Sequence, residues 1–159
     1  SKFLERSFEA RYREIERNLY LTAVGYLKNT EDARDMVQEA AITGYLSYSE
    51  LKDAEKFKPW ITRILINKCK DFLRRAKVKR QCTDKIIDKG GVFEQLPETE
   101  LEMMDLICKL PEKYRYYIVL RFYAGLTYKE ISQTLRIPES TVKSRMKSAL
   151  RIVDEWIRS

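Results

Sequence analysis

The chain has 159 residues and no histidine, and its 31 basic and 24 acidic residues give a net charge of +7. That charge is moderate for a protein that binds nucleic acid, so the positions of the basic residues matter more than their sum. The sequence has no CxxC pair, glycine-rich phosphate loop, nucleophile elbow or histidine base. These absences argue against an enzyme and against a bound metal or cofactor.

The sequence also indicates where the protein works. Cys69, Cys82 and Cys108 are odd in number and widely spaced, as expected for buried or incidental thiols in a reducing cytoplasm. No apolar run approaches the roughly 20 residues that cross a bilayer, and the charged start is unlike a secretory signal. We therefore predict a cytoplasmic protein with no integral membrane segment.

The spacing of apolar residues predicts three helices in the first half of the chain. They cover residues 4–27, residues 30–46 and a segment opened by Pro59, with a polar connection at 47–57. Asn29 and Thr30 end the first helix and cap the second. Trp60 shares an apolar stripe with Ile64, so we expect it in the core. The first helix should bury one face, formed by Phe8, Tyr12, Ile15, Leu19, Thr22, Ala23 and Tyr26.

A second helical domain follows a segment of weak periodicity. Residues 77–97 predict a linker between a domain at 1–76 and a domain at 98–159. The second domain should contain a helix near 98–109 and another, opened by Pro111, that runs to about 123. Gly125 stands where a helix often ends in a left-handed residue. The predicted fold class is all-α, with two small helical domains joined by a flexible linker.

Residues 127–151 predict a helix-turn-helix. Thr127 and Glu130 form a capping box at its start, and the run Arg136-Ile137-Pro138 ends the first helix and begins the second. Between residues 140 and 151 there are four basic residues and no acidic one, a face that suits phosphates and base edges. The second helix should bury Val142, Met146, Ala149 and Leu150.

Two segments of the chain resemble one known family. The segment KLPEKYRYYIVLRFYAGLTYKEISQTLRIPESTVKSRMKSAL is similar to the minus-35-binding domain of bacterial sigma factors of the extracytoplasmic-function (ECF) group. EDARDMVQEAAITGYLSY, followed by FKPWITRILINKCKDFLRR, is similar to the other sigma domain. The two matches stand in the family's order and cover nearly the whole chain. The resemblance implies an alternative sigma factor that directs RNA polymerase to promoters.

The resemblance implies a polymerase-binding face on the second helix. Asp32, Asp35, Gln38 and Glu39 match the motif that grips the clamp helices of core RNA polymerase. Charged and amide groups spaced three and four residues apart share one helical face and can pair with a partner helix. Without the rest of the motif, an ordinary solvated helix start would be the preferred interpretation. Ala41 departs from the pattern, because a larger, often aromatic, residue is usual there.

The resemblance also implies a promoter minus-10 site in the first domain. Family members hold an unstacked base in a pocket between the 47–57 loop and the helix after it, which offsets the cost of unstacking. The matching residues are Tyr48, Leu51, Lys56 and Phe57 in the loop, and Arg63, Asn67, Lys70 and Arg74 on the helix.

In the second domain the resemblance implies that the last helix reads the minus-35 element in the major groove. The residues of this helix expected to face DNA are Ser140, Thr141, Lys143, Ser144, Arg145, Lys147 and Ser148, and Arg115, on an earlier helix, is expected to touch the flanking backbone. Two positions depart from the family. Ser132 replaces a usual alanine, and Arg136 replaces a common glycine, which adds strain if that position needs a positive φ.

The partners implied are core RNA polymerase, promoter DNA (duplex at minus-35, single-stranded at minus-10) and an anti-sigma factor, with no cofactor. A stand-alone helix-turn-helix regulator is the alternative; it would normally dimerise on a palindromic site, and it leaves the first domain unexplained. Isolated members of the group often conceal DNA-binding faces by packing the two domains together. The apolar linker residues Ile86, Ile87, Val92 and Phe93 predict a version in which they dock between the domains.

Overall fold

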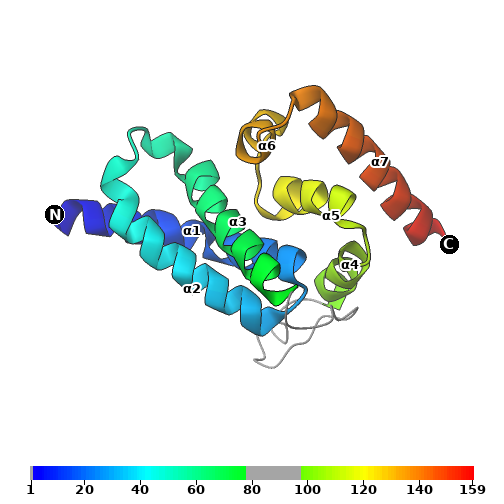
Figure 1. Cartoon of the computed structure of the whole chain (residues 1–159), viewed down its shortest axis with the longest axis horizontal. Helices are drawn as coiled ribbons and strands as arrows, with labels where there is room; N and C mark the ends of the chain where they lie inside the picture. Colours follow the sequence, from blue (N-terminus) through cyan, green and yellow to red (C-terminus); the bar gives the residue numbers. More distant parts are fainter. Residues whose placement is uncertain (1, 78–97) are drawn as a thin grey trace.

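The structure is a computed structural model that describes residues 2–77 and 98–159. Every element in these two ranges is helical (Figure 1). The first domain consists of α1 (Lys2–Leu27), α2 (Thr30–Ser47), the short turns η1 (Tyr48–Glu50) and η2 (Ala54–Lys56), and α3 (Phe57–Ala76). The second consists of α4 (Glu98–Cys108), α5 (Glu112–Ile118), the π-helix η4 (Val119–Tyr123), α6 (Tyr128–Leu135) and α7 (Glu139–Arg158).

The helix boundaries follow local signals. The Asn29 side chain accepts a hydrogen bond of 2.9 Å from the backbone N–H of Asp32, as the sequence predicts for the cap of α2. Helix α3 begins at Phe57, two residues before the proline expected to open it. Gly125 has the expected left-handed conformation, with φ of +72°. The proposed docking of Ile86, Ile87, Val92 and Phe93 lies outside the described residues.

The second half of α1 is buried on every side, which the sequence analysis did not predict. The expected face is buried or half-buried, but so is every other residue from 19 to 27. One side of α1 packs against α2 and α3, and another packs against α5 and η4 of the second domain. A helix buried all round lies inside a core. The two domains therefore share one continuous apolar core, with α1 at its centre.

Polar and aromatic contacts join the domains along α1. Arg115 on α5 donates from Nε to the Gly25 carbonyl oxygen at 2.8 Å and from a terminal nitrogen to the Leu110 carbonyl oxygen at 2.8 Å. The Tyr26 and Tyr116 rings are stacked, with centroids 3.9 Å apart and an interplanar angle of 4°. Nearer the surface, Asn18 donates to the Tyr123 carbonyl oxygen at 2.9 Å, and Arg17 pairs with Glu100. We call this set of residues the interdomain contact.

Across the described ranges, no helix combines the length and the apolar character needed to span a bilayer.

Both cysteines within the described residues are buried. Cys69 on α3 and Cys108 on α4 are free thiols, and burial raises their pKa to about 12 and about 11. Only the thiolate reacts readily with alkylating agents. At pH 8 we therefore expect both thiols to react with iodoacetamide at least about a hundred-fold more slowly in the native chain than in urea. Peptide mass spectrometry over a labelling time course measures this, and rapid native labelling of either residue would contradict the placement.

Candidate nucleic-acid interface

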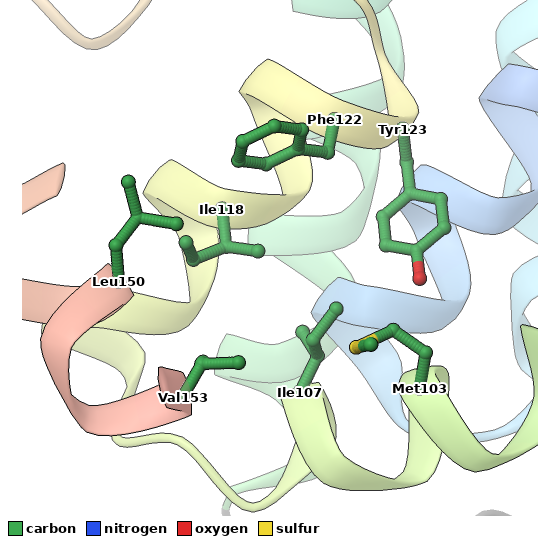
Figure 2. Close-up of a pocket in the computed structure, with 7 residues that line it drawn as sticks. All are labelled: Met103, Ile107, Ile118, Phe122, Tyr123, Leu150 and Val153. Atoms are coloured by element: carbon green, nitrogen blue, oxygen red, sulfur yellow. The ribbon is translucent and has the colours of Figure 1, made fainter. Parts of the chain in front are cut away.

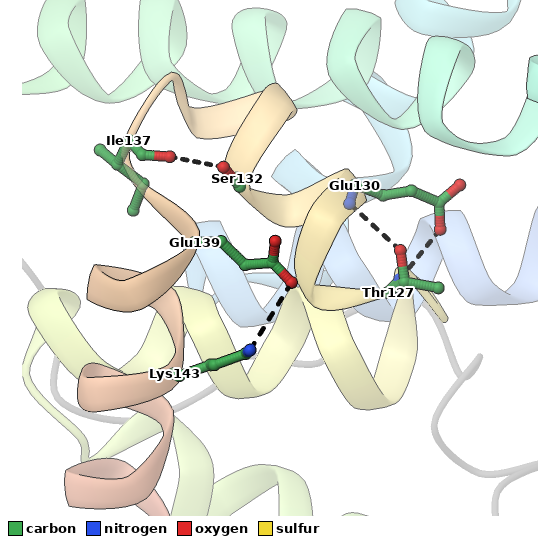
Figure 3. Close-up of polar contacts among 6 residues, drawn as sticks. All are labelled: Thr127, Glu130, Ser132, Ile137, Glu139 and Lys143. Carbon is green, nitrogen blue, oxygen red and sulfur yellow. Dashed lines mark hydrogen bonds and ion pairs between the residues drawn. The ribbon is translucent and has the colours of Figure 1, made fainter.

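The helix-turn-helix is held together by the capping box that the sequence predicts. Thr127 Oγ1 accepts from the Glu130 backbone N–H at 3.1 Å, and Glu130 accepts from the Thr127 N–H at 2.9 Å (Figure 3). Arg136 ends α6 in the left-handed conformation, with φ of +57° and ψ of +48°. A non-glycine residue is strained there. The turn thus needs the positive φ that the family's usual glycine supplies.

Ser132 helps to hold this turn. Its hydroxyl donates to the Ile137 carbonyl oxygen at 2.6 Å (Figure 3). Its own carbonyl oxygen accepts from the N–H groups of Arg136 and Ile137. An alanine at this position would lack the hydroxyl bond. The serine therefore gives the strained turn a hydrogen bond that the family's usual residue does not provide.

The outer face of α7 presents the residues expected to contact DNA. Ser140, Lys143, Ser144, Arg145 and Lys147 are exposed, and Thr141 and Ser148 are half-buried. Lys143 pairs loosely with Glu139 at 3.9 Å, and the Arg145 guanidinium lies over the Tyr117 ring, 5.7 Å from its centroid. Val142, Met146 and Ala149 face inward and are fully or almost fully buried. The helix therefore separates a core side from a basic outer side, as predicted.

Arg115 does not lie on this surface. Its side chain is only 3% exposed and is held in the interdomain contact by the Gly25 and Leu110 carbonyl oxygens. The expectation that Arg115 touches DNA does not hold in this arrangement of the domains. The expectation came from the family resemblance, which gives no information about the carbonyl oxygens that bind this side chain in the folded chain.

Leu150 also differs from the prediction, because it is 41% exposed rather than buried. It lines an open apolar groove of about 300 Å³ between α4, the α5–η4 segment and α7 (Figure 2). The groove is lined by Met103, Ile107, Ile118, Phe122, Tyr123, Leu150 and Val153.

The face of α2 expected to bind polymerase is largely open to solvent. Asp35, Gln38 and Glu39 are exposed, and Asp32 is half-buried within the capped first turn. Beyond them the same helix exposes apolar side chains, with Ile42 63% and Leu46 74% accessible. Positions 35, 39, 42 and 46 are three or four residues apart and so follow one helical face. This apolar extension was not predicted, although the three- and four-residue spacing of Ile42 and Leu46 from Glu39 and Ile42 is visible in the sequence.

The loop expected to hold an unstacked base is only partly available. Tyr48 and Phe57 are 8% and 4% exposed and pack edge-to-face against Phe8, with centroids 5.4 and 5.7 Å from its ring. The Tyr48 hydroxyl also hydrogen-bonds to Ser7 at 2.9 Å. These two rings are core residues here, which corrects the expectation that they face DNA. Trp60 is half-buried against the same cluster, as predicted.

Leu51 and Lys56 are the other two loop residues expected at the minus-10 site. Leu51 is half-buried and Lys56 is exposed. On α3, Asn67, Lys70 and Arg74 are exposed and Arg63 is half-buried, with Arg74 paired to Asp71. What remains accessible is thus a polar, mainly basic side of α3 and the tip of the loop. Across the described ranges no cluster of acidic or cysteine side chains forms a metal site.

Comparison with known proteins decides the family. The family described as Sigma-70 region 2 matches residues 11–78, and the family described as Sigma-70, region 4 matches residues 100–153. The chain is 32% identical to RNA polymerase sigma factor SigV of Bacillus subtilis (strain 168), over 86% of this chain and 82% of that protein. This chain belongs to the sigma-70 family.

Further relatives place it in the ECF group. ECF RNA polymerase sigma factor SigW of Bacillus subtilis (strain 168) is 32% identical, over 84% of this chain and 81% of that protein. As a member of this group, the chain is a transcription initiation factor. The alternative of a stand-alone helix-turn-helix regulator does not account for the region 2 match over the first domain.

Solved structures share the fold. The sigma factor RpoE of Bartonella quintana, in complex with the anti-sigma factor NepR, matches with a TM-score of 0.79 and 18% identity, over 95% of this chain and 96% of that chain. CnrH, in complex with the cytosolic domain of CnrY, matches with a TM-score of 0.69 and 19% identity, over 96% and 88%. Both likenesses span the two domains of this sigma factor.

The strain at Arg136 leads to a stability prediction. Arg136→Gly should raise the free energy of unfolding by about 1 kcal/mol, because glycine adopts a positive φ without a Cβ clash. Urea unfolding followed by circular dichroism measures this. Gln133→Gly, at an exposed position further inside α6, is the matched control and should lower stability by about 1 kcal/mol. Equal effects of the two glycines would contradict the role of the left-handed turn.

Proposed function

We propose that this sigma factor binds core RNA polymerase through the outer face of α2 and promoter DNA through α7 and the accessible side of α3. Polymerase supplies the catalysis, and the chain itself is not an enzyme and works in the cytoplasm. The observation that carries the proposal is the pairing of region 2 and region 4, in that order, with a basic outer face on the second helix of the helix-turn-helix.

Each proposed surface carries side chains whose chemistry suits its proposed partner. Lys143, Arg145 and Lys147 offer cationic groups for phosphates and base edges of duplex DNA, with arginine suited to guanine. Asn67, Lys70 and Arg74 offer an amide and two cations to a single strand at the minus-10 element. On α2, carboxylates continue into Ile42 and Leu46, a combination of charged and apolar groups that suits docking against a partner helix.

The control of this sigma factor by an anti-sigma factor is part of the proposal. RpoE and CnrH were both captured with a partner protein, named in the first case as an anti-sigma factor. Their likeness to this chain extends over both domains, so this chain offers an anti-sigma partner a similar arrangement of the two domains.

The proposal predicts promoter-specific transcription that depends on Arg145. Core polymerase with the full chain should give a defined run-off product from the DNA upstream of the gene that encodes it. Arg145→Ala should reduce the affinity of that complex for the promoter by about 1–3 kcal/mol and relax selection at one base pair of the minus-35 element. Band-shift titrations on single-base variants measure both effects.

Arg158→Ala is the control for Arg145, because Arg158 is exposed on the last turn of the same helix and pairs with Asp154. We expect it to leave promoter affinity unchanged. Failure of the wild-type chain to bind core polymerase or to give a specific product would refute the proposed function.

The α2 face generates a separate prediction. The double change Asp35→Lys and Glu39→Lys should weaken binding to core polymerase at least about ten-fold, because it replaces attraction to a cationic partner face with repulsion. Fluorescence anisotropy of the labelled chain, titrated with core polymerase, measures the affinity. The double change Glu9→Lys and Glu14→Lys, at two exposed acids of α1, alters the net charge equally; it is the control and should bind as the wild type does. Equal losses would mean that net charge, not this face, sets the affinity.

A further inference from the structure

The minus-10 loop, residues 47–57, has an exposed middle with buried residues on either side. Residues 52–56 are exposed in an unbroken run, whereas Tyr48 before them and Phe57 after them are 8% and 4% exposed. The turn η2 inside this run is capped by the Asp53 side chain. A loop fixed only near its two ends keeps conformational freedom that DNA binding has to remove. Support from another element would reduce that cost.

The start of α1 supplies such support through an aromatic ring. Phe8 is 5% exposed, and its ring meets Tyr48 and Phe57 edge-to-face. A Cβ at Gly44 on α2 would lie 3.3 Å from the Phe8 ring, so the ring also packs closely against that helix. Edge-to-face aromatic pairs stabilise a contact beyond the area that they bury. Phe8 therefore fixes both ends of the exposed run against the helices of the first domain.

Two hydrogen bonds connect the same part of α1 to the loop. Ser7 Oγ and the Tyr48 hydroxyl share a hydrogen bond of 2.9 Å. Arg11, one turn further along α1, donates from Nη1 to the Ala54 carbonyl oxygen at 3.3 Å. That oxygen also accepts from the Phe57 N–H, which closes η2. Arg11 therefore contacts the middle of the exposed run, and Ser7 contacts the buried tyrosine at its start.

These α1 residues lie at or before the start of the region 2 match. The family described as Sigma-70 region 2 matches from residue 11, so Ser7 and Phe8 precede it. Positions 7, 8 and 11 share one helical face, which the contacts above direct at the loop. A binding site selects its ligand only when supporting residues hold the contacting residues in place.

We propose that Ser7, Phe8 and Arg11 are positioning residues, which hold the minus-10 loop in the shape that accepts one unstacked base. Leu51 and Lys56 contact the DNA, and the α1 residues act through them. Base selection at the minus-10 element then depends on residues outside the usual region 2 segment. The positioning is a property of the free chain. Its consequence for base selection rests on the function proposed above.

Hydrogen–deuterium exchange of the free full chain tests the positioning. Arg11→Ala should raise the exchange rates of the Lys56 and Phe57 amides about two- to ten-fold, the worth of one hydrogen bond. Arg11→Lys keeps a cationic donor and should restore part of the protection. Arg13→Ala removes the same charge from an exposed position of α1 and is the matched control. Equal exchange in Arg11→Ala, Arg13→Ala and the wild type would overturn the proposal.

The hydroxyl pair gives an independent test on the same free chain. Ser7→Ala and Tyr48→Phe each remove one partner of a single hydrogen bond. Both should raise the exchange rate of the Leu51 amide, which donates to the Tyr48 carbonyl oxygen at 3.1 Å. The double variant should exchange no faster than either single variant, because the bond is already lost. Additive effects, or no effect, would overturn the role of Ser7.

Run-off transcription from a promoter pool randomised across the minus-10 element tests base selection. Core polymerase is supplied with each full chain, and sequencing of the product gives the base preference at every position. Arg11→Ala should reduce discrimination at one position about two- to ten-fold, because an exposed loop has an opening free energy near zero and a shift in its equilibrium passes into binding. Arg13→Ala should match the wild type.

The pattern of the losses separates the possible outcomes. A uniform fall in product with unchanged base preferences would mean a merely structural role for Arg11 and would overturn the inference about base selection. Affinity for duplex minus-35 DNA should stay unchanged in Arg11→Ala, since α7 lies in the other domain. No specific product from any chain, wild type included, would refute the proposed function, while the exchange rates would still decide whether α1 positions the loop.

Discussion

The close packing of the Val119 side chain against the α1 backbone at Gly25 is the constraint on which the arrangement of this protein depends. Because position 25 has no side chain, Val119 lies directly against α1. That approach brings the Arg115 guanidinium to 2.8 Å from the Gly25 carbonyl oxygen and stacks Tyr116 on Tyr26. The absence of a side chain at Gly25 thus permits the second half of α1 to lie at the centre of the shared core.

The π-helix η4 transmits this constraint to the DNA-reading helices. It begins at Val119, and its wider turn is closed by the Ala124 N–H donating to the Val119 carbonyl oxygen at 3.0 Å. Gly125 then reverses the chain into the Thr127 cap of α6. Only a few residues separate the buried valine from the helix-turn-helix, so the contact with α1 fixes the orientation of α6 and α7 relative to the first domain.

The sequence was sufficient where the physical signal is local. The capping box at Thr127, the cap at Asn29 and the left-handed Gly125 each depend on residues within four positions, and the structure confirms them. The helix-turn-helix and the exposed basic side of α7 could therefore be predicted. The π-helix was predicted only as ordinary helix, because its widened turn accommodates a tertiary contact.

The sequence was insufficient where burial depends on a distant partner. Apolar periodicity assigned one buried face to α1, but it carries no information about a second domain that covers the opposite face. The same limit explains Arg115, since a buried arginine needs carbonyl acceptors that only the folded chain brings together. Tyr48 and Phe57 stand in a polar connection and were expected at the surface, yet both fill a gap beside Phe8.

The modest charge of the chain is consistent with a protein whose binding is divided among surfaces. A helix with many more phosphate contacts would bind most DNA sequences without the help of polymerase, because the affinity that comes from phosphate contacts does not depend on sequence. The net charge of +7 and the basic residues on the outer face of α7 keep this general attraction limited. Two modest DNA contacts joined in one polymerase-bound chain reinforce each other only where both elements stand at the right spacing.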